Sequence, residues 1–145
     1  MKLDILIEQG FRLFCRMYPS DKYAQGIDID FTNELKDPSV PAVYILSNSK
    51  EEILKIGQSS HIHNRFNRMY KCVVNTTNNR IRAHIRDKEQ IYAYVLPMER
   101  LVSVFENKHS SRELSTSYAP SLEKLLLKEY KKSYGTVPLL NCGVM

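Results

Sequence analysis

Three short apolar runs in the middle of the chain predict three β-strands. Residues 42–46 and 53–57 are separated by a short polar link, a pattern typical of an antiparallel hairpin. Residues 91–96 are rich in aromatic and β-branched side chains and end at Pro97, which makes them the strongest strand pattern in the chain. We therefore expect a small three-stranded antiparallel sheet.

Helical periodicity surrounds these strands. Apolar positions in residues 1–18 recur at mostly helical spacing and predict an amphipathic helix. Residues 98–108 and 120–132 show the same periodicity, and Pro120 suits the first turn of the second stretch. A further helix after Gly57 is predicted by four residues on one apolar face: Ile62, Phe66, Met69 and Val73.

The remaining segments are less regular. Residues 19–41 are rich in Asp, Asn and Pro and indicate a loop, and residues 75–88 fit either a loop or a short helix. A tail at 136–141 is short and partly extended. Together the pattern predicts an α+β domain over residues 41–145, preceded by a helical extension over residues 1–40.

The charge of the chain is unevenly distributed. The chain has 145 residues, the size of one ordinary domain, and a formal net charge of +5. Residues 55–88 have eight Lys and Arg against one Asp, a net charge of +7, whereas residues 1–54 sum to −3 and residues 89–145 to +1. Such a basic segment indicates a partner that is a polyanion, although a solvated basic surface would look the same.

Several classes of protein are disfavoured by the sequence. The first residues lack the uninterrupted apolar core of a signal peptide, and no segment approaches the roughly 18 apolar residues that a membrane span needs. The three cysteines have no Cys-x-x-Cys spacing, so a zinc site is not expected. We expect a cytoplasmic protein with no membrane partner.

One carboxylate breaks the pattern of the last predicted helix. On a helical wheel, Glu123 falls inside the apolar face. A carboxylate there needs a partner, a proton or a metal, because burying it alone is costly. Glu123 could instead tilt into water at the favourable first turn, and Glu129 lies near the other margin of the same face.

Two kinds of cation also interrupt apolar patterns. Lys55 divides the run of residues 53–57, and alternation places it on the same face as Ile53. An edge strand with one face in water would explain it. Arg65 and Arg68 flank the apolar stripe of the following helix, where they could snorkel into water or hold a phosphate.

These residues resemble the core of the GIY-YIG nuclease family. Ala42-Val43-Tyr44, Lys55-Ile56-Gly57 and Asn64-Arg65-Phe66 follow the order of the family's two motifs and its arginine helix. The segments around Glu123 and Asn141 resemble the family's metal-binding helix and its later asparagine. Lys55 replaces the second tyrosine, as in certain restriction endonucleases of the family.

The resemblance implies a catalytic site for phosphodiester hydrolysis. Glu123 would bind one Mg²⁺ or Mn²⁺ that stabilises the leaving oxygen. Tyr44 would deprotonate or orient the attacking water, and Lys55 would favour its phenolate. Arg65 would hold the scissile phosphate, and Asn141 would orient a group at the metal or the substrate.

The resemblance also implies a metal-dependent DNA endonuclease. A restriction-type enzyme acting on duplex DNA as a homodimer fits best. A nicking or structure-specific nuclease and a catalytically silent DNA-binding module are the alternatives. The residues expected to contact DNA are Gln58, His63, Arg68, Lys71, Arg80, Arg82 and Arg86.

Overall fold

The computed structural model describes residues 1–22, 26–32, 41–96 and 118–141, and the structural statements below concern these residues. The helix expected over residues 98–108 lies outside them. In chain order the elements are α1 (Leu3–Glu8), β1 (Arg12–Pro19), β2 (Ile27–Phe31), β3 (Ala42–Ser47), β4 (Ile53–Ser59), α2 (Ile62–Asn64), η1 (Arg65–Tyr70), α3 (Thr76–Asp87), β5 (Ile91–Leu96), α5 (Tyr118–Tyr134) and η3 (Leu139–Asn141).

The sheet has five strands and not the three expected. Its order is β2-β1-β5-β3-β4, and every neighbouring pair is antiparallel. The three predicted strands are confirmed as β3, β4 and β5. The two strands that the pattern missed, β1 and β2, lie within residues 1–40 and pair with β5 through β1.

The N-terminal helix is much shorter than predicted for a physical reason. Phe11 and Phe14 are three residues apart, as on one side of a helix, but they pack in different clusters on the two faces of the sheet. A register shift between Leu13 and Cys15 breaks the alternation of β1. A β-bulge of this kind produces spacing that resembles helical periodicity. Where the sequence predicts a helical extension, the described part of residues 1–40 contains α1, β1 and β2.

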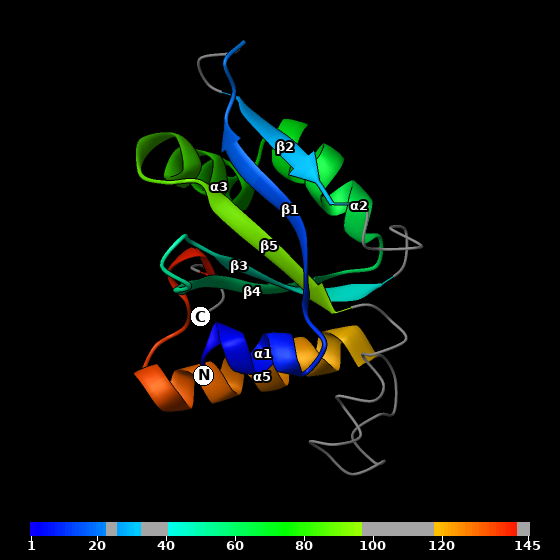
Figure 1. The fold of residues 1–145 in the computed structure, drawn as a ribbon, viewed down its shortest axis with the longest axis vertical. Helices are drawn as coiled ribbons and strands as arrows, with labels where there is room; N and C mark the ends of the chain where they lie inside the picture. Colours follow the sequence, from blue (N-terminus) through cyan, green and yellow to red (C-terminus); the bar gives the residue numbers. More distant parts are fainter. Residues whose placement is uncertain (23–25, 33–40, 97–117, 142–145) are drawn as a thin grey trace.

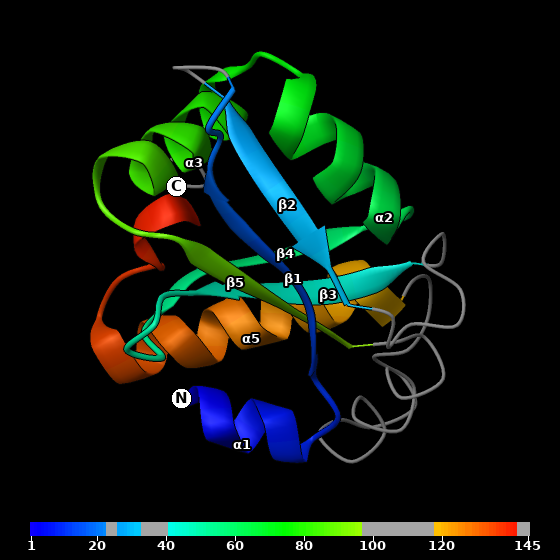
Figure 2. The same ribbon diagram turned by 45° about the horizontal axis from the view of Figure 1, so that its top comes forward.

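Helices cover both faces of the sheet. The segments α2, η1 and α3 pack on one face, and α1 and α5 pack on the other (Figures 1 and 2). Strand β3 is buried along its whole length. A strand covered on both sides is expected to be continuously apolar, which is why residues 42–46 have no polar alternation.

A second β-bulge sets the direction of Lys55. Leu46 pairs with Lys55, and Ser47 pairs with Ile53, so Leu54 is the extra residue. The bulge puts Lys55 on the face of Leu46, whereas Ile53 packs in the cluster on the opposite face. The expectation that Lys55 shares a face with Ile53 is wrong, because simple alternation does not account for the inserted residue.

The helical segment after β4 has an unusual geometry. It begins as α2 and continues as a π-helical stretch, η1.

Two further α-helices follow in the described residues. Residues 75–88, which fitted a loop or a short helix, form α3. The Asn75 side chain caps this helix by accepting a hydrogen bond from the Asn78 amide at 2.8 Å. The helix expected over residues 120–132 is present within α5. In the described part of the chain, no helix has the length and apolar character to cross a bilayer.

The edge of β4 is closed by an asparagine from the C-terminal segment. The Asn141 Oδ1 accepts from the Ile56 amide at 2.8 Å, and its Nδ2 donates to the Ile56 carbonyl at 2.8 Å. Strand β4 is an edge strand, so these backbone groups have no further strand to pair with. Asn141 is 3% exposed and thus replaces a missing strand at one residue.

The first prediction concerns this contact. Replacing Asn141→Ala leaves two buried backbone groups of Ile56 unpaired, so we expect a loss of about 2 kcal/mol or more in the free energy of unfolding. Urea denaturation measures the loss, and Asn67→Ala, at an exposed asparagine, is the control. An Asn141→Ala protein as stable as the wild type would show that this amide has no structural role.

Candidate active site

Four elements bring the predicted catalytic residues into one cluster. Tyr44 comes from β3, Lys55 from β4, Arg65 from η1 and Glu123 from α5. Charges on Arg65 and Glu123 influence the ionisation of both Tyr44 and Lys55. Side chains that lie 79 positions apart in the sequence, such as Tyr44 and Glu123, are therefore electrostatic neighbours in the fold.

Tyr44 occupies a space that only a glycine on β4 leaves open. Tyr44 and Gly57 are directly opposite each other in the β3–β4 pair. A Cβ atom at position 57 would overlap the ring and hydroxyl of Tyr44. The glycine of the Lys55-Ile56-Gly57 segment is thus needed for close approach of the Tyr44 ring to the backbone.

The Tyr44 hydroxyl has a buried partner. It forms a short hydrogen bond with the hydroxyl of Tyr70, whose ring centroid is 6.1 Å from that of Tyr44. Burial raises the pKa of Tyr44 to about 12, against the opposing effects of the Tyr70 hydrogen bond and the Arg65 charge. The expected contribution of Lys55 is absent from the groups that shift this pKa, and the net shift disfavours the phenolate. The proposed activation of Tyr44 by Lys55 is therefore not supported.

Tyr70 is the member of the cluster that the sequence reasoning missed. The Arg65 guanidinium lies over the Tyr70 ring, with Cζ 6.0 Å from the ring centroid. In a π-helix the hydrogen bonds span five residues. Residues 65 and 70 therefore lie more nearly on the same side of the helix than they would in an α-helix. The only sequence signal was that Tyr70 follows Phe66 by four positions on the apolar face. π-Helical segments often occur at functional sites.

Arg65 has an unused donor in the cluster. Its Nε is buried and has no hydrogen-bond partner among the described residues. A buried guanidinium N–H without a partner is unusual, because the lost hydrogen bond costs free energy. An anionic ligand such as a phosphate would satisfy it.

Burial acts on the two opposite charges of the cluster. Lys55 is 9% exposed, and burial and the Arg65 charge lower its pKa, while Glu123 acts in the opposite direction. Burial also raises the pKa of half-buried Glu123, against the effects of Lys55 and Arg65. Both shifts favour the uncharged form of each side chain. The attraction between Lys55 and Glu123 therefore does not fully offset the cost of burying their charges.

Glu123 is the carboxylate whose charge acts on Tyr44 and Lys55 in this cluster. Among the residues that the structure describes, no group of three or more His, Cys, Asp or Glu side chains could hold a metal ion. A single carboxylate fits a hydrated hard cation, which completes its shell with water and phosphate oxygens, and does not fit Zn²⁺. The donor set is thus compatible with Mg²⁺ or Mn²⁺ only when the substrate supplies further oxygens.

Three other predicted residues lie outside the cluster. Gln58 pairs with Val43, so it is on the opposite face of the sheet from Tyr44. His63 stacks on Phe31, with ring centroids 4.6 Å apart. Both polar groups of the Asn141 side chain are bound to the Ile56 backbone, next to Lys55, so Asn141 positions the strand.

The predicted basic residues differ in exposure. Arg68, Lys71 and Arg80 are exposed and Arg86 is half-buried. Arg82 is 7% exposed and donates to the carbonyl oxygens of Tyr70 and Val73. A surface cavity of about 690 Å³ between α1, the β3–β4 turn and α5 is lined by none of the predicted site residues.

The second prediction tests the Tyr44–Tyr70 hydrogen bond. Tyr44→Phe and Tyr70→Phe each leave a buried hydroxyl unpaired, so each should lower the free energy of unfolding by roughly 1–2 kcal/mol. The double variant should lose less than the sum, by about 1 kcal/mol, because the same bond is removed twice. Urea denaturation of the four proteins measures this coupling.

Tyr134 supplies a matched control for this cycle. Its hydroxyl donates to the Met1 carbonyl at 2.8 Å, in an exposed contact away from Tyr44. Combining Tyr44→Phe with Tyr134→Phe should give additive losses. Additive losses for Tyr44→Phe and Tyr70→Phe as well would mean that the two hydroxyl groups are not bonded in solution.

Comparison with known proteins identifies the fold. No protein-family model matches the sequence, and no curated protein matches it significantly. Among solved structures, the chain is similar to the restriction endonuclease HPY188I, determined in complex with product DNA. The TM-score is 0.53 and the identity is 17%, and the match covers 99% of this chain and 86% of that one. The chain therefore shares the α+β fold of that structure.

Proposed function

We propose that this protein is a metal-dependent DNA endonuclease of the GIY-YIG type. The observation that supports this most is the convergence of Tyr44, Lys55, Arg65 and Glu123 from four elements. The sequence motifs predict the same four residues. The similarity of fold to a restriction endonuclease in complex with product DNA favours DNA as the substrate.

Arg65 is the group proposed to bind the scissile phosphate. Its guanidinium is fixed over the Tyr70 ring, and its Nε donor lacks a partner among the described residues. A guanidinium can hold a phosphate through two parallel hydrogen bonds. Because the side chain is already oriented by the π-helical segment, little rotamer entropy is lost when the phosphate binds.

Tyr44 and Lys55 are proposed to act on the attacking water in different ways, Tyr44 by orienting it and Lys55 by accepting its proton. A phenol with a pKa of about 12 stays protonated at neutral pH, so Tyr44 orients the water. The lowered pKa of Lys55 moves its amine toward the working pH, and a general base is most effective near that pH. Lys55 is therefore the better proton acceptor of the two.

Glu123 is proposed to hold one Mg²⁺ or Mn²⁺. A cation bound there would act as a Lewis acid and stabilise the charge on the leaving oxygen. The half-buried carboxylate has an unfavourable environment for its charge, which is shown by its raised pKa. Binding a cation removes that cost, because the charge then has a strong partner.

A restriction-type activity on duplex DNA is the form of the proposal that the fold comparison favours. With one cluster in each chain, cutting both strands at one site needs two copies, so we propose a homodimer. A nicking or structure-specific nuclease would use the same cluster on one strand. A silent DNA-binding module would bind DNA without cutting it.

The third prediction is Mg²⁺-dependent cleavage. Purified protein incubated with supercoiled and linear duplex DNA should cut both in Mg²⁺ and neither in EDTA. Glu123→Gln should lower the rate at least ~100-fold, the loss seen when one preorganised electrostatic contact is removed from a transition state. Discrete fragments would indicate a restriction-type enzyme, and random nicks the alternative nuclease.

Matched variants make this experiment specific. Glu129→Gln changes a carboxylate on the same helix whose charge is not among those acting on Tyr44 or Lys55, and it should cut at the wild-type rate. Full cleavage by folded Glu123→Gln protein would show that Glu123 is not part of the catalytic site.

The pH dependence of cleavage tests the role of Lys55. Wild-type activity should rise with pH through the lowered pKa of Lys55, and Lys55→Arg should remove the rise because arginine stays charged.

A further inference from the structure

A second basic site lies beside the helical segment that contains Arg65. A surface cavity of about 560 Å³ opens between the end of this segment and α3. Three cationic side chains line it: Lys71, Arg82 and Arg86. Asn79 and Cys72 add polar groups to the lining. The lining contains no carboxylate among the described residues.

Arg82 forms the fixed part of this cavity. Its Nη1 donates to the Tyr70 carbonyl at 2.6 Å, and its Nη2 donates to the Val73 carbonyl at 2.8 Å and to Asn79 Oδ1 at 2.7 Å. These carbonyl groups end the helical segment, so Arg82 caps it. The guanidinium is thereby held rigidly, 7% exposed, at the wall of the cavity.

The charges around this cavity repel one another. Burial and the neighbouring Arg86 charge both lower the pKa of Arg82. Lys71 adds a third cation to the lining. A cavity with several like charges is electrostatically unfavourable when empty, and an anion would relieve the repulsion. A rigid guanidinium beside two further cations is suited to a phosphate group.

We infer that this cavity binds a backbone phosphate of the DNA substrate, at a nucleotide away from the scissile bond. The inference rests on the proposed function, since it assumes that DNA is the substrate. It separates the predicted basic residues into two groups with different roles. Lys71 and Arg86 contact the phosphate, whereas Arg82 holds the backbone at Tyr70 in place beside them.

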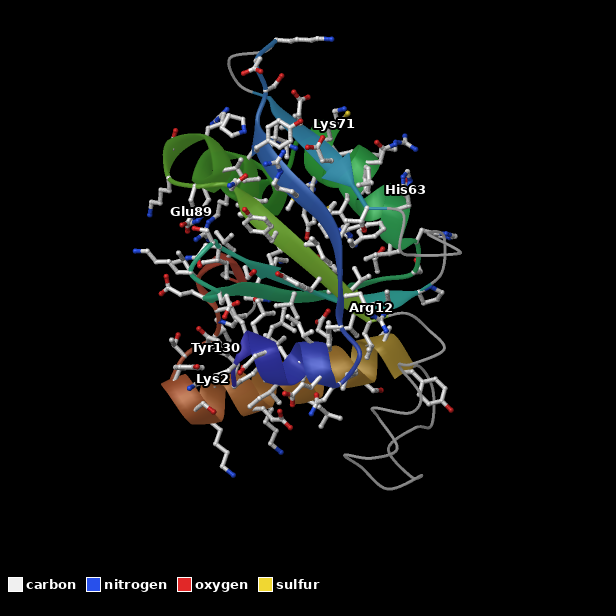
Figure 3. All side chains as sticks on the ribbon, viewed as in Figure 1. Lys2, Arg12, His63, Lys71, Glu89 and Tyr130 are labelled. Atoms are coloured by element: carbon white, nitrogen blue, oxygen red, sulfur yellow. The ribbon has the colours of Figure 1, made fainter. Side chains whose placement is uncertain are left out.

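The position of the cavity relative to Arg65 fits one bound duplex. Arg65 and Lys71 are six residues apart on one helical segment, so one bound duplex can reach both side chains. Figure 3 shows His63 and Lys71 near the two ends of this segment. Arg82 also binds the carbonyl of Tyr70, which fixes the cavity to the candidate active site.

Exposed cations outside the cavity favour DNA over a free phosphate ion as the source of the group. Arg68 on η1 and Arg80 on α3 are exposed and do not line this cavity. A polyanion can contact them while one of its phosphates occupies the cavity, whereas a single ion cannot.

The salt dependence of DNA binding tests the inference. Affinity for a duplex is measured in EDTA, where no cleavage occurs, over a range of KCl concentrations. The slope of log K against log [salt] falls by about 0.9 for each phosphate that is no longer neutralised. The double variant Lys71→Gln/Arg86→Gln should therefore lose about 0.9, and each single variant at most that. Lys22→Gln, at an exposed lysine after the end of β1 that does not line the cavity, should lose nothing.

Two results would overturn the inference. An unchanged slope in the double variant means that no phosphate binds in the cavity, and a loss of about 1.8 means that Lys71 and Arg86 contact separate phosphates. Thermal unfolding of each variant verifies the fold, and exposed Lys71→Gln remains informative if the double variant is unstable. Stabilisation by inorganic phosphate that depends on Lys71, with an unchanged DNA slope, would assign the cavity to a free ion. DNA binding is read separately from cleavage, so failure of the proposed catalysis remains distinguishable.

Discussion

The close contact between the Tyr44 ring and the Gly57 backbone is the constraint on which the candidate site depends. It brings β3 and β4 together at the point where their side chains face the helical segment η1. The Tyr44 hydroxyl then reaches Tyr70, and the ring of Tyr70 receives the Arg65 guanidinium. One glycine, two phenols and one arginine thus fix the distance between the sheet and the helix that would bind phosphate.

The electrostatics of the cluster are those of an incomplete site. Burial disfavours the charges of Lys55 and Glu123, and the buried Nε of Arg65 has no partner among the described residues. Natural proteins usually pair buried charges or omit them, because unpaired ones reduce stability. A phosphate at Arg65 and a cation at Glu123 would satisfy both groups. The proposed function would thus account for the cost of burying these charges.

The sequence predicted the parts of the fold that follow simple periodicity. The hairpin of β3 and β4, strand β5 and helix α5 were found because burial on one or two faces leaves a regular apolar pattern. Strands β1 and β2 were missed because a bulge in β1 imitates helical spacing. Tyr70 and the direction of Lys55 were missed for a related reason: a π-helical stretch and a β-bulge each shift positions that regular periods would place elsewhere. The family resemblance implies a catalytic role for Asn141, yet its side-chain amide is bound to the backbone of an edge strand, which only the strand order reveals.

The position of a bound metal tests the central claim most directly. Crystals of the Tyr44→Phe protein grown with duplex DNA and Mn²⁺ allow the metal to be located by anomalous diffraction. We expect a peak within coordination distance of a carboxylate oxygen of Glu123, with a DNA phosphate oxygen and waters as further ligands and Arg65 on the same phosphate. A Mn²⁺ ion bound at other residues, with Glu123 remote from both metal and phosphate, would contradict it.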